Sequence, residues 1–222
     1  MKQECDFIIP FNWDNRKTVR WEKCLYIPDS FSNHDASVIR WDDPSVFEKP
    51  QPIMIEFCSG NGQWIAHMAE QMPHLNWIAV EMDFERARKI WLKIFRNHLP
   101  NLFLAYGEGM TFANHYVPAG MVREVYVNFP DPWPKRRHAK HRIVQPPFVQ
   151  QIARILEPQG TATLVTDDIE TSERFIDHFA AWKSRFGDQN FVNEWPEYYI
   201  SYFHSLWLQK EKTIRYHRFT HG

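Results

Sequence analysis

Short apolar runs alternate with amphipathic segments through the middle of the chain. Residues 53–57, Ile-Met-Ile-Glu-Phe, form a run typical of a buried strand, and residues 63–71 then carry apolar side chains at helical spacing. The same alternation predicts further strands at 76–80, 102–106, 124–128 and 161–166, and further helices at 85–98, 147–156 and 170–186. Such an order predicts right-handed crossovers and an α/β fold, with a mostly parallel central sheet and helices on both faces.

The two ends of the chain differ from this middle part. Residues 1–50 mix tryptophans, prolines and charges without a sustained period, and Pro50-Gln51-Pro52 interrupts the chain after them. We therefore expect an N-terminal extension over 1–50 and one main domain over 51–222. Near the C-terminus, residues 212–219 alternate like an edge strand.

Acidic residues fall at or just past the ends of the predicted strands. In a parallel sheet, ligands bind outside the carboxyl ends of the strands. One such acid would be unremarkable, because Asp and Glu commonly cap helices, but five at successive strand ends favour a ligand site. The sequence thus predicts a site at one edge of the sheet that is lined by Glu56, Glu81, Glu108, Asp131 and Asp167.

The turn after the first predicted strand constrains the ligand. Gly60-x-Gly62 allows a close backbone approach, but Ile65 stands where a dinucleotide fingerprint needs a third small residue. Glu81 follows about twenty residues later, where an acid binds ribose hydroxyls in nucleoside-binding sheets. Glu56 would repel a pyrophosphate and suits an ammonium or sulfonium, which favours S-adenosylmethionine over NAD. Equally, Glu56 could be a structural acid that accepts hydrogen bonds from the backbone of its own turn.

A proline-rich loop and a basic run follow the strand at 124–128. In Asn128-Phe129-Pro130-Asp131-Pro132-Trp133-Pro134, each proline fixes its own φ and biases the preceding residue towards extended geometry. Five of the eight residues from Lys135 to Arg142 are Lys or Arg. This pattern indicates a site for a nucleic-acid base beside a track of phosphates. The alternatives are a solvated basic face, and a Trp133 that packs under the loop instead of stacking on a base.

Bulk properties exclude several classes of protein. The net charge is −1, the N-terminus lacks the apolar stretch of a secretory signal, and no run of apolar residues is long enough to cross a membrane. The three cysteines form no C-x-x-C pair, and His138 and His141 have no matching Cys or carboxylate cluster, so we expect neither a disulfide framework nor a metal site. We expect a cytoplasmic protein that does not associate with membranes.

Several motifs resemble the bacterial tRNA (guanine-N7-)-methyltransferase family over about residues 53–186. They are Glu56-x-x-x-Gly60-Asn61-Gly62, Glu81 after the second strand, Phe129-Pro130-Asp131-Pro132-Trp133-Pro134-Lys135, Arg137-His138, Arg142-x-Val144-Gln145-Pro146-Pro147-Phe148 and Thr166-Asp167. The resemblance implies a Rossmann-like class I methyltransferase fold with S-adenosylmethionine as methyl donor. It also implies tRNA as the partner, without an obligate protein partner, and the variable-loop guanine at position 46 of tRNA as the substrate.

The resemblance also implies roles for individual residues. Asp131 would be the catalytic residue. Cofactor contacts would come from Glu56, Gly60, Gly62, Glu81, Glu108 and Asp131, and substrate contacts from Lys135, Asp167, Ser201 and His204. RNA would be bound by Arg136, Arg137, His138, Lys140 and Arg142.

The chain departs from the family pattern at three places. Cys58 replaces a family glycine, and Glu108 replaces an acid that is usually Asp. Near the C-terminus the family has Thr-Lys-Phe-Glu, whereas this chain has Ser201-Tyr202-Phe203-His204, so the acid is lost.

The methyl transfer implied by this resemblance depends mainly on placing guanine N7 correctly against the methyl group. Guanine N7 carries a lone pair and no proton, so no general base is required to make it a nucleophile. A fixed carboxylate at Asp131 would stabilise the positive charge that arrives on the purine. The rival functions are an RNA-binding module of the same fold with little or no turnover, a small-molecule or DNA methyltransferase, and an NAD oxidoreductase, which Ile65 and Glu56 disfavour.

Overall fold

The computed structural model describes residues 6–133, 135, 137–138, 142–186, 190–192, 194–196 and 198–222. The chain divides into two compact units. The first unit comprises Met1–Pro52 and Ser59–Tyr116, and the second comprises Ile53–Cys58 and Val117–Gly222. No helix among the described residues is both long and apolar enough to cross a membrane.

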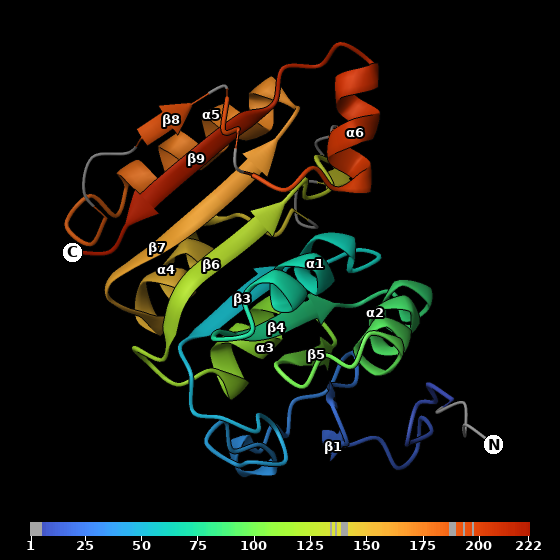
Figure 1. The fold of residues 1–222 in the computed structure, drawn as a ribbon. Coiled ribbons are helices and arrows are strands. Elements are labelled where there is room, and N and C mark those ends of the chain that lie inside the picture. Colours follow the sequence, from blue (N-terminus) through green and yellow to red (C-terminus); the bar gives the residue numbers. More distant parts are fainter. Residues whose placement is uncertain are drawn as a thin grey trace. The chain divides into compact units, whose positions relative to one another are not determined.

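Among the described residues, four strands build the sheet of the first unit, in the order β1-β2-β5-β4. They are β1 (Val19–Trp21), β2 (Cys24–Tyr26), β4 (Asn76–Glu81) and β5 (Leu102–Tyr106). Figure 1 labels β1, β4 and β5. β1 is antiparallel to β2, whereas β2 and β4 both run parallel to β5. The carboxyl ends of β2, β4 and β5 therefore lie at one edge of this unit.

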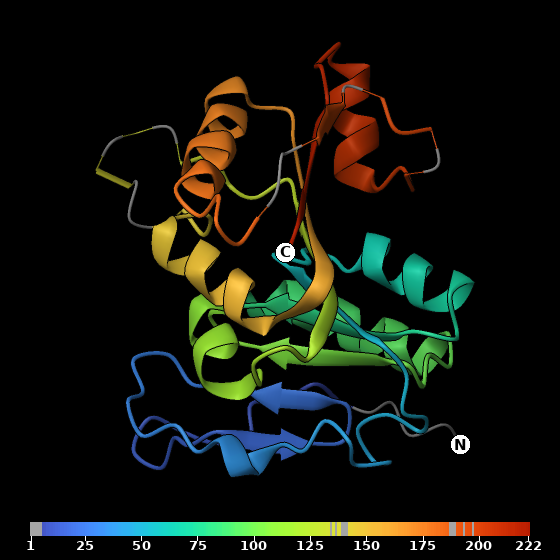
Figure 2. The same cartoon turned by 90° about the vertical axis from the view of Figure 1, so that its left-hand side faces the viewer.

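α-Helices cover the sheet of the first unit. α1 (Gln63–Gln71) and α2 (Phe84–Arg96) lie on one face, and α3 (Gly109–Tyr116) lies on the other (Figure 2). A short 3-10 helix spans Ala36–Val38. α2 begins where the Asp83 side chain accepts a hydrogen bond from the Arg86 N–H, and it buries a stripe formed by Ala87, Ile90, Trp91 and Ile94.

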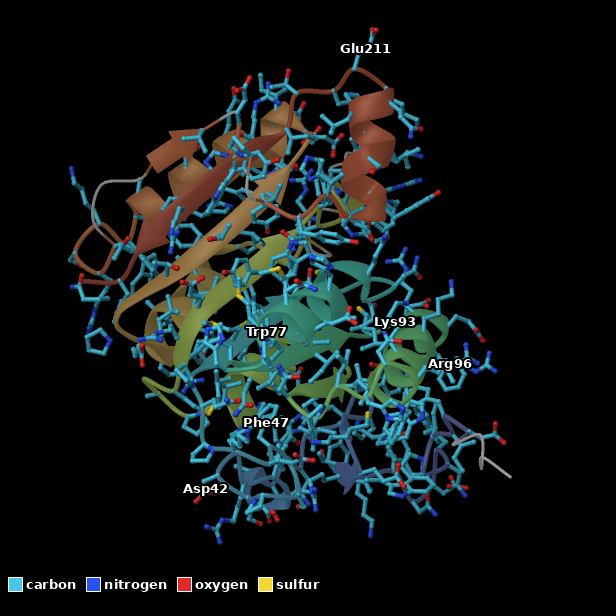
Figure 3. All side chains as sticks on the ribbon, in the orientation of Figure 1. Asp42, Phe47, Trp77, Lys93, Arg96 and Glu211 are labelled. Carbon is cyan, nitrogen blue, oxygen red and sulfur yellow. The ribbon has the colours of Figure 1, made fainter. Side chains whose placement is uncertain are left out.

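The core of the first unit is aromatic and includes part of the N-terminal segment. Trp77 on β4 is fully buried, and Phe47 is buried too (Figure 3). The Phe47 ring packs 6.2 Å, centroid to centroid, from Phe103 on β5. The buried Asn101 amide donates to the carbonyls of Ala69 and Leu75, both at 2.9 Å, and so satisfies the end of α1 and the loop that follows it.

In the described part of the second unit, five strands build the sheet, in the order β3-β6-β7-β9-β8. They are β3 (Ile53–Phe57), β6 (Val122–Asn128), β7 (Leu156–Thr166), β8 (Asn190–Val192) and β9 (Arg215–Thr220). β3, β6 and β7 are parallel, and β9 is antiparallel to both β7 and β8. The carboxyl ends of β3, β6 and β7 share one edge with the start of β9.

Helices lie on both faces of the sheet in the second unit (Figure 2). α4 (Pro146–Ile155) and α5 (Ile169–Ala180) cover one face, and α6 (Tyr202–Gln209) lies on the other. Neighbouring residues of β9 face opposite sides, as the pleat requires. His217 Nε2 lies 2.9 Å from Ser172 Oγ on α5, while the Tyr216 hydroxyl lies 3.0 Å from His204 Nε2 on α6.

The α/β alternation and the mostly parallel pairing predicted from the sequence are confirmed. Three details are wrong. The helix expected over 170–186 ends at Ala180, because the chain then turns so that Phe186 pairs with His221. β7 begins at Leu156, earlier than expected. The C-terminal strand is not an edge strand, since β9 is paired on both sides by β7 and β8. β1, β2, β8, α3 and α6 were not predicted.

Candidate active site

Glu81 is the last residue of β4, at the carboxyl edge of the first unit. Its carboxylate is 5% exposed and accepts three backbone hydrogen bonds. Gly60 N–H donates to Oε2 at 2.8 Å, and the Met82 and Asp83 N–H groups both donate to Oε1 at 2.9 Å. Burial raises the pKa of Glu81, and these donors oppose that rise. The carboxylate is thus fixed in position, and its oxygens retain lone pairs for a further donor.

The glycine turn beside Glu81 leaves no room for a larger side chain at Gly62. Gly60 and Gly62 have left-handed φ angles of 55° and 65°. A Cβ at Gly62 would lie 2.5 Å from Ile90 Cγ1 on α2, so glycine is required there for close packing as well as for its φ. Lys93 on α2, labelled in Figure 3, donates from Nζ to the Asn61 carbonyl at 2.9 Å. This hydrogen bond stabilises the turn.

Ser59 precedes these glycines and is a structural residue. Its N–H donates to the Val80 carbonyl at 3.0 Å, and its Oγ accepts from the Val80 N–H at 3.1 Å. The hydroxyl is therefore used to attach the turn to β4.

Glu108 lies just past β5, at the same edge as Glu81. Its carboxylate accepts hydrogen bonds from the N–H groups of Met110 at 3.1 Å and Thr111 at 2.6 Å, so it caps α3. It also borders a cavity of about 420 Å³ within the first unit. The cavity is lined by Glu108, Thr111 and the segment after β2, which comprises Ile27, Pro28, Asp29, Ser30 and Phe31.

Glu56 is the corresponding acid of the second unit. It belongs to β3, is 2% exposed, and faces the end of β6. Asn128, the last residue of β6, donates from Nδ2 to Glu56 Oε1 at 2.7 Å. The Tyr198 hydroxyl donates to Asn128 Oδ1 at 2.6 Å. A buried carboxylate at the carboxyl edge of this unit is thereby held through an amide that directly precedes the proline loop.

The proline loop begins with an unusual backbone. Phe129 and Trp133, each followed by proline, have φ angles of 48° and 43°. The expectation that they are extended is therefore wrong. Phe129 N–H donates to the Val165 carbonyl on β7 at 2.8 Å, and Arg142 donates from Nη2 to the Trp133 carbonyl at 2.8 Å. These hydrogen bonds hold conformations that each cost about 1–3 kcal/mol.

The charged side chains of the proline loop and of the segment after it are accessible. Asp131, Lys135 and Arg137 are exposed, and His138 is half-buried with its ring 5.5 Å from that of Trp133. Trp133 itself is 36% exposed. Arg142 donates to the carbonyls of Pro132 and Trp133 and so supports the loop. Arg136 and Lys140, expected to bind RNA, lie outside the described residues, as do Pro134 and His141.

Asp167 follows β7 at the edge where Glu56 and the proline loop lie. Its side chain is half-buried, and burial raises the pKa of its carboxyl, while the positive charges of Lys212 and Arg215 act in the opposite direction. Its neighbour Asp168 caps α5 by accepting from the Thr171 N–H at 2.8 Å. The two adjacent acids therefore differ in role, since only Asp168 is used as a helix cap.

The diverged positions Ser201 and His204 are part of the packing around α6. Ser201 caps the helix by accepting a hydrogen bond from the His204 N–H at 3.4 Å. His204 is 4% exposed, with Nε2 3.0 Å from the Tyr216 hydroxyl and its ring 5.8 Å from the Phe129 ring. Burial lowers the pKa of His204. Contact of either side chain with substrate stays a prediction.

The structure groups the predicted residues by unit. Glu81 and Glu108 lie at the carboxyl edge of the first unit, with Gly60 bonded to Glu81. Glu56, Asp131 and Asp167 lie at or beyond the carboxyl edge of the second unit. That all five acids share a single edge stays a prediction. Sequence reasoning missed the roles of Asn128 and Tyr198; the place of Asn128 between a strand and the proline loop was the one available signal.

Comparison with known proteins identifies the family. A family model described as a putative methyltransferase matches residues 50–215. The tRNA (guanine-N(7)-)-methyltransferase of Chlamydia felis is 37% identical over 215 residues, which cover 96% of this chain and 95% of that protein. The protein of the same name from Chlamydia caviae is 38% identical over 213 residues, covering 95% and 94%.

Solved structures of lower identity share the fold. A structure described as an antibiotic-related methyltransferase has a TM-score of 0.60 at 16% identity, covering 87% of this chain and 97% of that one. An rRNA methylase from Streptococcus thermophilus has a TM-score of 0.54 at 14% identity, covering 77% and 87%. The fold is thus the Rossmann-like class I methyltransferase fold, as the sequence led us to expect. By its near-full-length similarity to the two chlamydial enzymes, the chain belongs to the tRNA (guanine-N(7)-)-methyltransferase family.

Proposed function

We propose that this protein transfers the methyl group of S-adenosylmethionine to N7 of a guanine in tRNA, and that this guanine is the one at position 46 of the variable loop. The observation that carries the proposal is the match to the Chlamydia felis enzyme over 96% of this chain. The geometry supports it, because carboxylates fixed by hydrogen bonds stand at strand ends in both units. S-adenosylmethionine supplies an electrophilic methyl group on a sulfonium that leaves as a neutral thioether.

The side chains of this chain fit that cofactor. Glu81 has both carboxylate oxygens oriented by backbone donors, and it can accept hydrogen bonds from ribose hydroxyls. Glu56, held by the Asn128 amide, suits an ammonium group. Gly60 and Gly62 allow a ligand to approach the backbone closely. We assign cofactor binding to these residues and to Glu108, which borders the cavity of the first unit.

The catalytic contribution of the chain is mainly placement and charge. Guanine N7 needs no base, so Asp131 is not required to remove a proton from it. A carboxylate at Asp131 would stabilise the positive charge that the purine acquires. It cannot accept a hydrogen bond from N7 or O6, which are themselves acceptors, but it can accept from the guanine N1–H and N2–H donors. We therefore assign Asp131 both to the orientation of the guanine and to charge stabilisation.

Exposed cations after the loop would bind the tRNA backbone. Lys135 and Arg137 are exposed and follow Asp131 in the chain, and the His138 ring lies 5.5 Å from that of Trp133. Each phosphate neutralised in this way adds to the affinity and to its dependence on salt. Lys135 and Asp167 would also contact the substrate guanosine. Since tRNA is the proposed substrate, we place the enzyme in the cytoplasm, acting without an obligate protein partner and through the domain spanning 51–222.

The proposal can be tested with unmodified tRNA and a methyl-labelled cofactor. The expected result is incorporation into tRNA with guanine at position 46, with label mapped there by strand scission at the N7-methylated base. A transcript with adenine at that position should accept little label. Binding of tRNA without incorporation would instead favour an RNA-binding module, and label at another guanine would overturn the assigned position.

A further inference from the structure

A buried hydrogen-bond chain joins the C-terminal segment to the acid of β3. The Tyr198 hydroxyl donates to Asn128 Oδ1 at 2.6 Å, and Asn128 Nδ2 donates to Glu56 Oε1 at 2.7 Å. Tyr198 is 8% exposed and lies seventy residues beyond Asn128 in the chain. This series of hydrogen bonds ends on Glu56, one of the carboxylates assigned to cofactor binding.

The direction of this chain fixes the orientation of the Asn128 amide. A carboxamide has an acceptor at one end and donors at the other. When the Tyr198 hydroxyl occupies the oxygen, the NH₂ group faces Glu56. Burial and the neighbouring Glu56 charge raise the pKa of Tyr198 well above its ordinary value, so the hydroxyl remains a donor across the physiological pH range. Without this hydroxyl, Asn128 Oδ1 loses the donor that holds it, and the amide bonded to Glu56 is less restrained.

The C-terminal segment that carries Tyr198 is itself well anchored. The Tyr198 ring packs 5.3 Å from Trp195 and 5.2 Å from Tyr216, centroid to centroid. The same segment leads into α6, where the ring of His204 lies 5.8 Å from Phe129. The C-terminal segment therefore contacts two consecutive residues, Asn128 and Phe129, just before Asp131.

We propose that Tyr198 is a positioning residue for methyl transfer: through Asn128 it orients the Glu56 carboxylate and the start of the proline loop. This inference rests on the proposed function, because Glu56 and Asp131 are assigned there to the cofactor and the guanine. It gives the diverged C-terminal segment a role in the site that does not require Ser201 or His204 to contact substrate.

The test removes the hydroxyl and keeps the ring, with Tyr198→Phe. We expect the dissociation constant of S-adenosylmethionine, measured by calorimetry without tRNA, to rise about tenfold, the factor that corresponds to one lost hydrogen bond. Turnover with tRNA should fall by a similar factor, whereas the Michaelis constant for tRNA should change by less than about twofold. A purely structural role would lower stability without producing this division between cofactor and tRNA.

Tyr116→Phe provides a matched control. Tyr116 is also buried, and its hydroxyl also forms hydrogen bonds, to Thr18 and to His34 Nδ1 at 2.8 Å, but these partners lie in the N-terminal segment and are not assigned to the cofactor. We expect the control to lower the unfolding temperature comparably while cofactor affinity stays within about twofold of wild type. Equal cofactor affinity in Tyr198→Phe and Tyr116→Phe would overturn the proposal.

A double-mutant cycle with Asn128→Ala tests whether Tyr198 acts on Glu56 through Asn128. If Tyr198 acts through Asn128, adding Tyr198→Phe to Asn128→Ala should change cofactor affinity by less than about twofold. If Tyr198→Phe lowers cofactor affinity tenfold both in wild type and in Asn128→Ala, Tyr198 does not act through Asn128. The calorimetry is independent of tRNA chemistry, so a wild-type protein that binds the cofactor but does not methylate tRNA would refute the proposed function and leave this comparison interpretable.

Discussion

The buried carboxylate of Glu81 accepts a hydrogen bond from the backbone N–H of Gly60 at 2.8 Å. This contact connects the last residue of β4 to the glycine turn that precedes α1. The same carboxylate accepts two further N–H groups from the chain that follows it. One side chain therefore shapes two loops at the carboxyl edge of the first unit, in addition to its proposed contact with ribose.

Glu81→Gln should damage both functions of this side chain. A glutamine NH₂ group would point its protons at one or more of the backbone donors and leave them unsatisfied. We expect a loss of about 1–3 kcal/mol in unfolding free energy and a fall in cofactor affinity of at least about tenfold. Denaturant unfolding and calorimetry would measure the two effects. Glu70→Gln, an exposed change on α1, should alter neither, and a Glu81→Gln protein with wild-type affinity would exclude Glu81 from the site.

Cys58, directly after β3, adopts a left-handed conformation. Its φ is 58°, which is tolerated poorly by β-branched side chains. We expect Cys58→Val to unfold more easily than Cys58→Ala, by about 1–2 kcal/mol, and Cys58→Gly to be at least as stable as Cys58→Ala. Urea unfolding of the three variants gives the order directly. Equal stability of the valine and alanine variants would show that the backbone relaxes at this position.

The elements that the sequence predicted well are those with a clear period and clear ends. Residues 63–71 were expected to be helical and form α1 with those bounds, because buried residues recur at helical spacing after Gly62. β2 has three residues, Cys24, Leu25 and Tyr26, all buried, which is too short for any period to show. α3 begins at Gly109, a poor helix former, and depends on the Glu108 cap, so propensity gave no indication of it.

The residues of the candidate site also differ in how well the sequence predicts them. Glu81, Glu108 and Asp167 could be placed from the sequence because each stands at or just past the end of a recognisable strand, at the carboxyl edge of its own unit. The hydrogen bond from Tyr198 to Asn128 could not, because it joins segments seventy residues apart and Tyr198 lies in a stretch without periodicity. The φ of Phe129 is likewise set by tertiary contacts with β7, which override the local preference of a residue before proline.

Asp131→Asn should separate catalysis from cofactor binding. The change keeps the size of the exposed side chain and removes the negative charge that would stabilise a methylated purine. We expect turnover to fall by at least about a hundredfold, with the dissociation constant of S-adenosylmethionine changed less than about threefold. Single-turnover methylation and calorimetry provide these values. Undiminished turnover in the variant would rule out a catalytic role for this carboxylate.

The exposed cations Lys135 and Arg137 should govern how tRNA binding responds to salt. Replacing both by alanine removes up to two phosphate contacts, so the slope of log affinity against log salt should become shallower by about 1–2 units. Filter binding over a series of salt concentrations measures it. The matched control is Lys183→Ala with Arg185→Ala, two exposed cations next to the bridge between Phe186 and His221. A slope that changes equally in both double variants would contradict a specific phosphate track.

His217 should make the stability of the protein depend on pH in mildly acidic solution. It is fully buried between β9 and α5, and burial, with a smaller contribution from Arg215, lowers its pKa from 6.5 to about 4. Between these values the unfolded chain binds a proton that the folded state does not, so the unfolding free energy falls as pH drops from 6.5 towards 4.

His217→Gln should flatten this dependence. Glutamine can still form a hydrogen bond with Ser172 but does not titrate, so the difference in unfolding free energy between neutral pH and pH near 4.5 should shrink by about 1–3 kcal/mol. Urea unfolding at a series of pH values measures the difference, and His74→Gln, an exposed change, serves as the control. If wild type and His217→Gln lose stability in parallel as the solution is acidified, His217 is not the group responsible, and the buried His204, whose pKa is lowered in the same direction, becomes the residue to replace next.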